Sequence, residues 1–139
     1  MKYAIYSIGL ALALGFTACK DDEDSPSRKE TLTGSTWTVT ARTSAGVADT
    51  LEACETDDRI RFNTNGTAVT DQGAVKCDPT DPQTSSGTWS LSSDEKVLTL
   101  SEDGISIALN ITSISTNKIQ VSFTDPIFGI QGTQTWETR

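Results

Sequence analysis

The sequence of 139 residues contains no histidine. This absence removes the commonest general base, the usual activator of Ser and Cys nucleophiles and the commonest metal ligand. Basic residues are also few, because 11 Lys and Arg stand against 19 Asp and Glu and give a formal net charge of -8. A nucleic-acid binder needs a basic stripe that displaces counterions. We therefore expect a protein that is not an enzyme, uses no cofactor and binds no nucleic acid.

Aromatic residues and long apolar runs are scarce as well. Aromatics make up 6% of the chain, too few for a platform that stacks sugars or bases unless the Trp are exposed. The apolar stretch over residues 3–16 is shorter than the about 20 residues of a transmembrane helix. It follows Met1-Lys2 and leads to Thr17-Ala18-Cys19. A positive start, a short apolar core and a small residue before the break form a secretory signal, so we predict a signal peptide over residues 1–18.

Phe16-Thr17-Ala18-Cys19 resembles the lipobox of bacterial lipoproteins. In that family the Cys is the first mature residue and receives a diacylglyceryl thioether and an amide-linked acyl chain such as palmitate. The resemblance implies that Cys19 is lipidated and that the membrane is a partner through this lipid, since two acyl chains already suffice for stable anchoring. Residues 20–23 also resemble an acidic export tag. This second likeness implies a lipid-anchored protein of the outer membrane, displayed at the cell surface.

The residues after Cys19 predict a flexible tether. Residues 20–30 are mostly charged, hold Ser25-Pro26-Ser27 at their centre and offer no apolar side chain that could dock. Such a segment reaches at most about 3.5 Å per residue. We therefore assign residues 19–30 to a lipidated Cys and an acidic tether, and residues 31–139 to one folded domain.

The domain has the pattern of an all-β protein. Short apolar-polar alternations are separated by turn residues at a spacing of roughly 8 to 12 residues. Asn65-Gly66 and Asp103-Gly104 fit tight hairpin turns, which need positive φ. The alternation predicts eight strands, over residues 36–42, 59–64, 67–72, 87–91, 96–100, 105–112, 118–124 and 128–137. Because the connections are short, we expect sequential pairing and closure into an eight-stranded antiparallel up-and-down barrel.

One face of each predicted strand is apolar and should line the barrel interior. These positions are Trp37, Val39, Ile60, Phe62, Val69, Trp89, Leu91, Leu98, Leu100, Ile105, Ile107, Leu109, Ile111, Ile119, Val121, Phe123, Phe128, Ile130 and Trp136. Almost all are bulky, which predicts a small cavity or none. If a cavity exists, we expect its lining among Trp37, Phe62, Trp89, Leu109, Phe123 and Trp136.

Two stretches carry a resemblance to the lipocalin-like domains of small bacterial lipoproteins. They are Leu32-Thr33-Gly34 followed by Trp37, and Gly87-Thr88-Trp89. The resemblance covers about residues 31–139 and implies the lipocalin-like barrel fold. It leaves two functions open, a structural or protein-interaction module of the cell envelope and, as the alternative, a binder of a small apolar ligand inside the barrel. We favour the module and expect a monomer.

Cys54 and Cys77 are predicted to form a disulfide. A two-residue turn at Asn65-Gly66 pairs residues whose numbers sum to about 131, and the two Cys meet that sum. They would fall at a hydrogen-bonded pair, where a bridge is awkward, so either the ends of the hairpin loosen or the turn is longer. The bridge would also gather acidic residues, which suit Ca²⁺ but more simply form a solvated rim, so we assign no metal. The Ca²⁺ candidates are Asp57, Asp58, Asp78 and Asp81.

Overall fold

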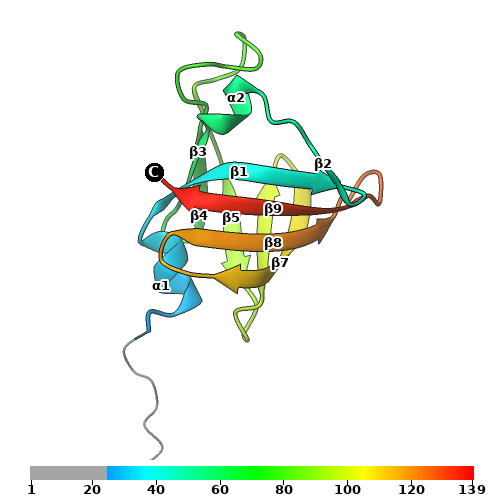
Figure 1. Cartoon of the computed structure of the whole chain (residues 1–139). Helices are drawn as coiled ribbons and strands as arrows, with labels where there is room; N and C mark the ends of the chain where they lie inside the picture. The colour runs from blue at the N-terminus through cyan, green and yellow to red at the C-terminus, as the bar shows by residue number, and fades with distance from the viewer. Residues whose placement is uncertain (1–24) are drawn as a thin grey trace, which may run out of the picture.

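Figure 1 shows the computed structural model, which describes residues 25–139. The predicted signal peptide, Cys19 and residues 20–24 lie outside the described residues. The elements are α1 (Arg28–Thr33), β1 (Thr36–Ser44), β2 (Val47–Ala48), α2 (Ala53–Thr56), β3 (Arg59–Phe62), β4 (Thr67–Asp71), β5 (Thr84–Leu91), β6 (Val97–Glu102), β7 (Ile105–Ile114), β8 (Lys118–Thr124) and β9 (Gln131–Thr138).

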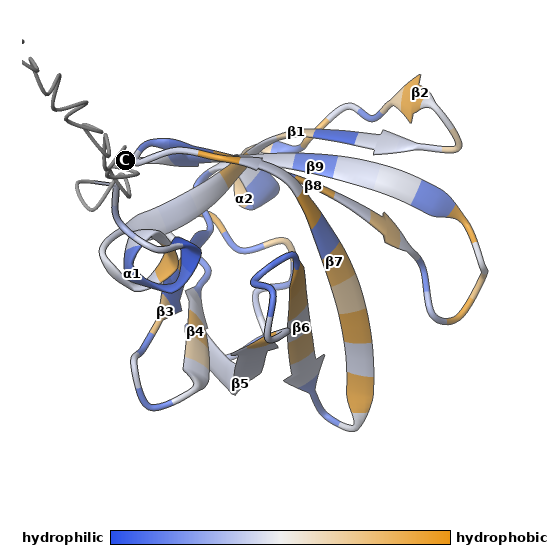
Figure 2. Cartoon of the chain, turned by 90° about the horizontal axis from the view of Figure 1, so that it is seen from below, coloured by the Kyte–Doolittle hydropathy of each residue, from blue (hydrophilic) through white to orange (hydrophobic). Residues whose placement is uncertain are grey.

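The strands form a closed antiparallel barrel, as predicted. β1 and β3 to β9 pair in sequence order, and β1 also pairs with β9, so eight strands close on themselves. The short strand β2 extends the edge of β1 as a hairpin. Hydrophobic bands gather on β6 and β7, whereas β9 is mostly polar (Figure 2). Closure removes the free strand edges that would otherwise pair with another chain.

The barrel has two different ends. At the closed end lie α1, both ends of the described chain and the β3–β4, β5–β6 and β7–β8 turns. At the open end lie α2, the β1–β2 hairpin and the β4–β5, β6–β7 and β8–β9 connections. Within the described residues, no helix is long and apolar enough to cross a membrane.

The helix α1 corrects the predicted tether, which ends sooner than residue 30. Ser27 and Glu30 form a capping box, in which each side chain accepts a hydrogen bond from the backbone N–H of the other residue. The helix carries Leu32 fully buried against the barrel. Arg28 donates to Glu95 in the β5–β6 turn, through its backbone N–H to the carboxylate and through its guanidinium to the carbonyl. The capping box therefore starts the helix, and Arg28 and Leu32 dock it on the barrel.

The β3–β4 turn corrects the predicted register by one residue. Phe62 pairs with Ala68 and Ile60 with Thr70, so the turn is longer than Asn65-Gly66. The Asn65 side chain accepts the Thr67 N–H at 3.0 Å, and Gly66 takes φ 86°, which is typical of a three-residue hairpin loop. Because side chains alternate between faces, this shift turns Ala68 inward and the predicted core residue Val69 outward.

The last predicted strand begins too early. The Asp125 carboxylate accepts the backbone N–H groups of Ile127 and Phe128 at 2.8 and 2.7 Å, which winds this segment into a turn. β9 therefore starts at Gln131 instead of residue 128. Phe128 and Ile130, which were expected to face the core, are 77% and 45% exposed.

Candidate functional site

The closed half of the barrel is filled by aromatic packing. The Phe62 ring stacks on Trp136 at 5.9 Å between centroids and meets Trp89 edge-on at 5.5 Å. The indole N–H groups are held as well: Trp37 donates to the Leu32 carbonyl at 3.0 Å and Trp89 to the Asn63 carbonyl at 2.9 Å. These residues are at most 7% exposed. The interior of the closed half is therefore filled by side chains.

The open half contains a cleft of about 400 Å³. Four inward-facing apolar side chains line it and stay only partly buried, namely Ile60, Ala68, Leu100 and Ile107. A smaller cavity of about 130 Å³ shares Ile60 and Thr70 with the cleft and continues it toward β1. We call the two together the lumen. Its volume falls in the range of small-molecule sites, which are concave and mostly apolar.

The predicted cavity-lining residues are divided between the two halves. Trp37, Phe62, Trp89 and Trp136 belong to the packed closed half, and Leu109 is buried in the core beside them. Phe123 is partly buried, and its ring lies so close over Gly132 that a Cβ there would come within 2.7 Å of it. The side chains that line the lumen, such as Leu100 and Ile107, were predicted to face inward but were not singled out as the lining.

A β-bulge brings Arg42 into the lumen. β1 shifts register between Val39, which pairs with Trp136, and Ala41, which pairs with Thr135. The extra residue changes which side chains point inward. Arg42 then pairs with Gln134, which in turn pairs with the buried Val121, so Arg42 lies on the inner face.

Arg42 is bound by two carboxylates. Its Nε donates to Asp49 at 2.9 Å and its Nη1 to Glu55 of α2 at 2.8 Å. The Ser44 hydroxyl donates to Asp49 at 2.8 Å. The pKa of Asp49 is lowered by the hydrogen bond from Ser44 and then by Arg42, and the pKa of Glu55 is lowered by the Glu52 backbone N–H and then by Arg42. This wall of the lumen is therefore charged but internally paired.

Asp58 is the exception on the same wall. It lines the smaller cavity with Ile60 and Thr70, and its Oδ1 is buried with no hydrogen-bond partner in the described part of the chain. Burial raises the pKa of Asp58, and the nearby Asp57, Glu55 and Asp71 raise it further. A buried carboxylate without a partner is costly unless a donor or cation meets it.

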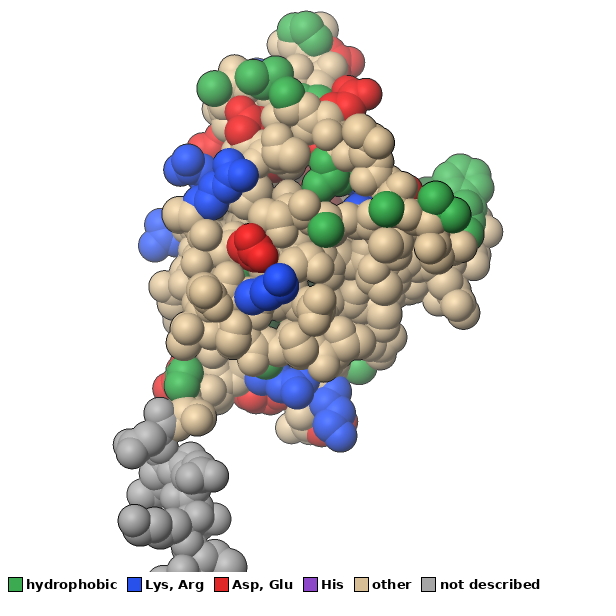
Figure 3. Space-filling model, viewed as in Figure 1, with side chains coloured by type: hydrophobic (Ala, Val, Ile, Leu, Met, Phe, Trp, Pro, Cys, Tyr) green, Lys and Arg blue, Asp and Glu red, His purple; other side chains and the backbone are tan. Residues whose placement is uncertain are grey.

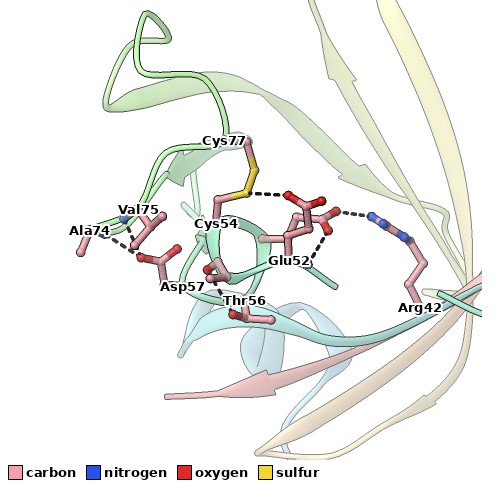
Figure 4. The surroundings of a disulfide bond; sticks show 10 residues. Arg42, Glu52, Cys54, Thr56, Asp57, Ala74, Val75 and Cys77 are labelled. Carbon is pink, nitrogen blue, oxygen red and sulfur yellow. Dashed lines mark hydrogen bonds and ion pairs between the residues drawn. A yellow bond between two sulfur atoms is a disulfide. The ribbon is translucent and has the colours of Figure 1, made fainter. Parts of the chain in front are cut away.

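The predicted disulfide is present. Cys54 of α2 is bonded to Cys77 in the β4–β5 connection, with their Cα atoms 5.1 Å apart (Figure 4). Both residues lie beyond the paired ends of β3 and β4, so the ends of the hairpin have loosened and its turn is also longer than two residues. The same two segments are joined by Asp57, whose Oδ2 accepts the N–H groups of Ala74 at 2.7 Å and Val75 at 2.9 Å. Together these contacts fix α2 beside the lumen.

The four Asp considered for Ca²⁺ do not converge. Asp57 accepts backbone N–H groups, Asp78 accepts the backbone and hydroxyl groups of Thr80, and the Asp81 carbonyl accepts Lys76. Asp58 faces the lumen instead. Over residues 25–139, no group of three or more Cys, Asp and Glu is placed to hold a metal ion.

The fold and the lumen define a class of protein, an up-and-down β-barrel with one packed end and one open end. The model of the lipocalin-like domain family matches residues 32–121, which is more than half of the chain. The chain therefore belongs to the lipocalin-like domain family. No curated protein matches it in sequence.

Proposed function

We propose that this chain is a non-catalytic lipoprotein of the cell envelope whose barrel binds a small amphiphilic ligand in the lumen. The lumen itself carries the proposal. Its wall is apolar at Ile60, Leu100 and Ile107, and it holds Asp58, whose Oδ1 is buried without a hydrogen-bond partner. The carboxylates of Glu102 and Asp103, both exposed, lie at the edge of the cleft. Ligand sites combine an apolar lining with a few polar groups that fix orientation.

The charge of the lumen sets the chemistry of the ligand. The positive charge of Arg42 is already matched by two carboxylates, Asp49 and Glu55, so this wall does not favour an anionic head group. Asp58 lacks a donor, and a cationic or hydrogen-bonding head group would supply one. The ligand we propose therefore has an apolar body that lies against Leu100 and Ile107 and a cationic or donor group at Asp58.

The anchoring part of the proposal rests on the sequence and on the position of α1. The lipid is assigned to Cys19, and the described chain begins at the closed end. A lipid at this side would leave the open end directed away from the membrane. The absence of histidine and the pairing of Arg42, Asp49 and Glu55 support a role without catalysis.

The test compares three probes of equal chain length, decylamine, decanol and decanoate. Methyl NMR should show saturable shifts of Ile60, Leu100 and Ile107 with decylamine, weaker shifts with decanol and the weakest with decanoate. The methyl groups of Leu98 and Ile119, buried in the closed half, serve as internal controls and should not move. Tryptophan emission should change little, because the three Trp lie outside the lumen lining.

Two variants separate the apolar and polar contributions. Leu100→Trp should fill the cleft and abolish binding of all three probes. Asp58→Asn should keep binding of decanol and reduce the preference for decylamine over it. Equal shifts in both halves of the barrel, or no saturable shift with any probe, would overturn the proposal.

The other function expected from the sequence, an interaction module, is supported by a different surface, the exposed apolar side chains at the open end.

A further inference from the structure

The exposed apolar side chains all gather at the open end. In the described residues, six large hydrophobic side chains are exposed, and each lies in a connection or at a strand end on this side of the barrel: Val47, Val75, Ile105, Ile127, Phe128 and Ile130. We call these six the apolar rim. Figure 3 shows hydrophobic side chains over the β4–β5 connection at the top and over the β1–β2 hairpin at the right. The closed end has no exposed large hydrophobic side chain in residues 25–139.

Backbone hydrogen bonds hold part of this rim in place. Asp125 accepts the N–H groups of Ile127 and Phe128, and its carbonyl accepts the Gly129 N–H at 2.9 Å. The Ala45 N–H in the β1–β2 hairpin donates to the Gln131 carbonyl at 2.8 Å, which joins this hairpin to the β8–β9 connection. Phe128 and Val47 are thus presented to solvent, 77% and 68% exposed, from two linked turns. Exposed apolar patches on such supports mark interaction sites.

Negative charge is also concentrated at the open end. The open-end segments, residues 42–59, 71–84, 102–105 and 125–131, hold eleven Asp and Glu and three Lys and Arg, a net -8. The rest of residues 25–139 holds four acidic and six basic residues, a net +2. Acidic and hydrophobic side chains alternate over α2 and the β4–β5 connection in Figure 3. The open end, which carries the apolar rim, is therefore net negative.

We propose that the apolar rim is a docking surface for a cationic amphipathic segment of a partner protein. Apolar side chains of the segment would cover Ile127, Phe128 and Val47, and its Lys and Arg would meet the surrounding carboxylates. Complementary charge speeds such encounters and selects against wrong partners. A second copy of this chain fits poorly, because two open ends of charge -8 would face each other. An anionic membrane is repelled for the same reason.

This inference goes beyond the ligand in the lumen, because it uses the outer surface of the rim. Only Ile105 belongs both to the rim and to the lining of the cleft. Loss of ligand binding in Leu100→Trp should therefore leave docking unchanged. The two proposals can fail separately.

The experiment uses a synthetic helical peptide of about 14 residues with Leu on one face and Lys on the other. Backbone NMR of the purified protein should show saturable shifts at Val47 and residues 125–131, and none in α1. Two control peptides have the same Leu content. One has the same composition in a shuffled order that breaks the two faces, and the other has Glu in place of Lys. Both should bind at least about tenfold more weakly, since each loses either the apolar face or the charge match.

Two variants of the protein test the two contributions. Ile127→Ser with Phe128→Ser should weaken peptide binding about tenfold or more, because both side chains would be buried on docking. Glu102→Gln with Asp103→Asn should weaken it severalfold at low salt and have little effect at high salt. Glu137→Gln at the closed end is the matched control and should change nothing. Thermal midpoints of all variants should stay close to that of the parent, since Glu102, Asp103, Ile127 and Phe128 are exposed and the ion pair of Glu137 with Lys118 lies at the surface, where it adds little stability.

Three outcomes would overturn the proposal. Equal binding of the shuffled peptide would show adhesion without a docking surface. Binding of anionic vesicles through residues 125–131, in preference to the peptide, would assign the rim to a membrane. Broadening of the same signals with protein concentration alone would assign it to a second copy of the chain.

Discussion

Removal of the disulfide should lower the stability of the domain considerably without preventing it from folding. The bridge joins Cys54 and Cys77, which are 23 residues apart. On the chain-entropy model, a closed loop of this size lowers the entropy of the unfolded state by about 11.5 cal/mol/K, which amounts to about 3.4 kcal/mol at 25 °C. The total free energy of unfolding of a native domain is about 5 to 15 kcal/mol. The double variant Cys54→Ala, Cys77→Ala should therefore still fold, but with a smaller free energy of unfolding.

The same free energy of about 3.4 kcal/mol predicts the change in thermal midpoint. An unfolding entropy of about 2.1 cal/mol/K per residue gives about 0.24 kcal/mol/K for a folded unit of about 115 residues, so 3.4 kcal/mol corresponds to about 14 °C. The fold should survive because the barrel closes without the bridge and because Asp57 still holds Ala74 and Val75. Calorimetry and urea titration of the oxidised parent and the double variant measure the two quantities.

Reductant provides the control for this prediction. It should lower the midpoint of the parent to that of the double variant and leave the variant unchanged. Asp57→Ala should cost more in the double variant than in the oxidised parent, because the carboxylate and the bridge close the same loop. The reasoning is refuted if the double variant lies within about 1 kcal/mol of the oxidised parent, or if its closed-half NMR signals are lost.

Three further predictions concern the helix α1, the lumen and the proposed lipid anchor. Leu32→Ala should cost about 2 to 5 kcal/mol by urea titration, because it empties a fully buried position, whereas Lys29→Ala in the same helix should cost less than about 0.5 kcal/mol. Asp58→Asn should raise stability at pH 7. The pKa of Asp58 is raised in the folded state, so the native state loses stability as pH rises from the unfolded pKa through the folded pKa. The gain from Asn should therefore vanish below that pH window. A gain that persists at lower pH would contradict this account. Cys19→Ser should move the protein to the soluble fraction on cell fractionation, whereas deletion of residues 20–24 should keep it on membranes but protect it from protease added to whole cells. Membrane recovery of Cys19→Ser at high salt would count against the lipid as the sole anchor, and unchanged digestion of the deletion would count against the export tag.

The strand pattern made the barrel predictable, but the turns decided which side chains line the lumen. Alternation was enough to place the eight barrel strands, and hairpin arithmetic brought Cys54 and Cys77 together although its register was wrong by one residue. The register of β3 and β4 depended on one extra turn residue, which the Asn65 side chain stabilises through Thr67. This difference exchanged Val69 for Ala68 on the inner face, and it replaced a bulky side chain with a small one beside the cleft.

Two other features were hidden for similar reasons. The bulge in β1 leaves no mark in the hydrophobic pattern, because Thr40, Ala41 and Arg42 fit either face of a strand end. At the start of β9, an Asp side chain outweighed the apolar run that followed it, and Phe128 became part of a turn. Polar side chains that bond to nearby backbone groups compete with strand pairing, and a period-two count does not register this competition. Arg42 and Asp58 were therefore missed as lumen residues.

The pairing of β1 with β9 has a mechanical consequence. Trp37 at the start of β1 lies opposite Thr138 at the end of β9, so both ends of the folded chain leave from neighbouring strands on the same side of the barrel. A force that pulls these ends apart would break the β1–β9 hydrogen bonds one after another, like a zipper. A force between the N-terminal side of α1 and a partner held at the open end would instead run along the strands and load many of these bonds at once. The domain should therefore unfold at low force when it is stretched between its two termini, and at higher force when it is pulled between its N-terminus and the open end.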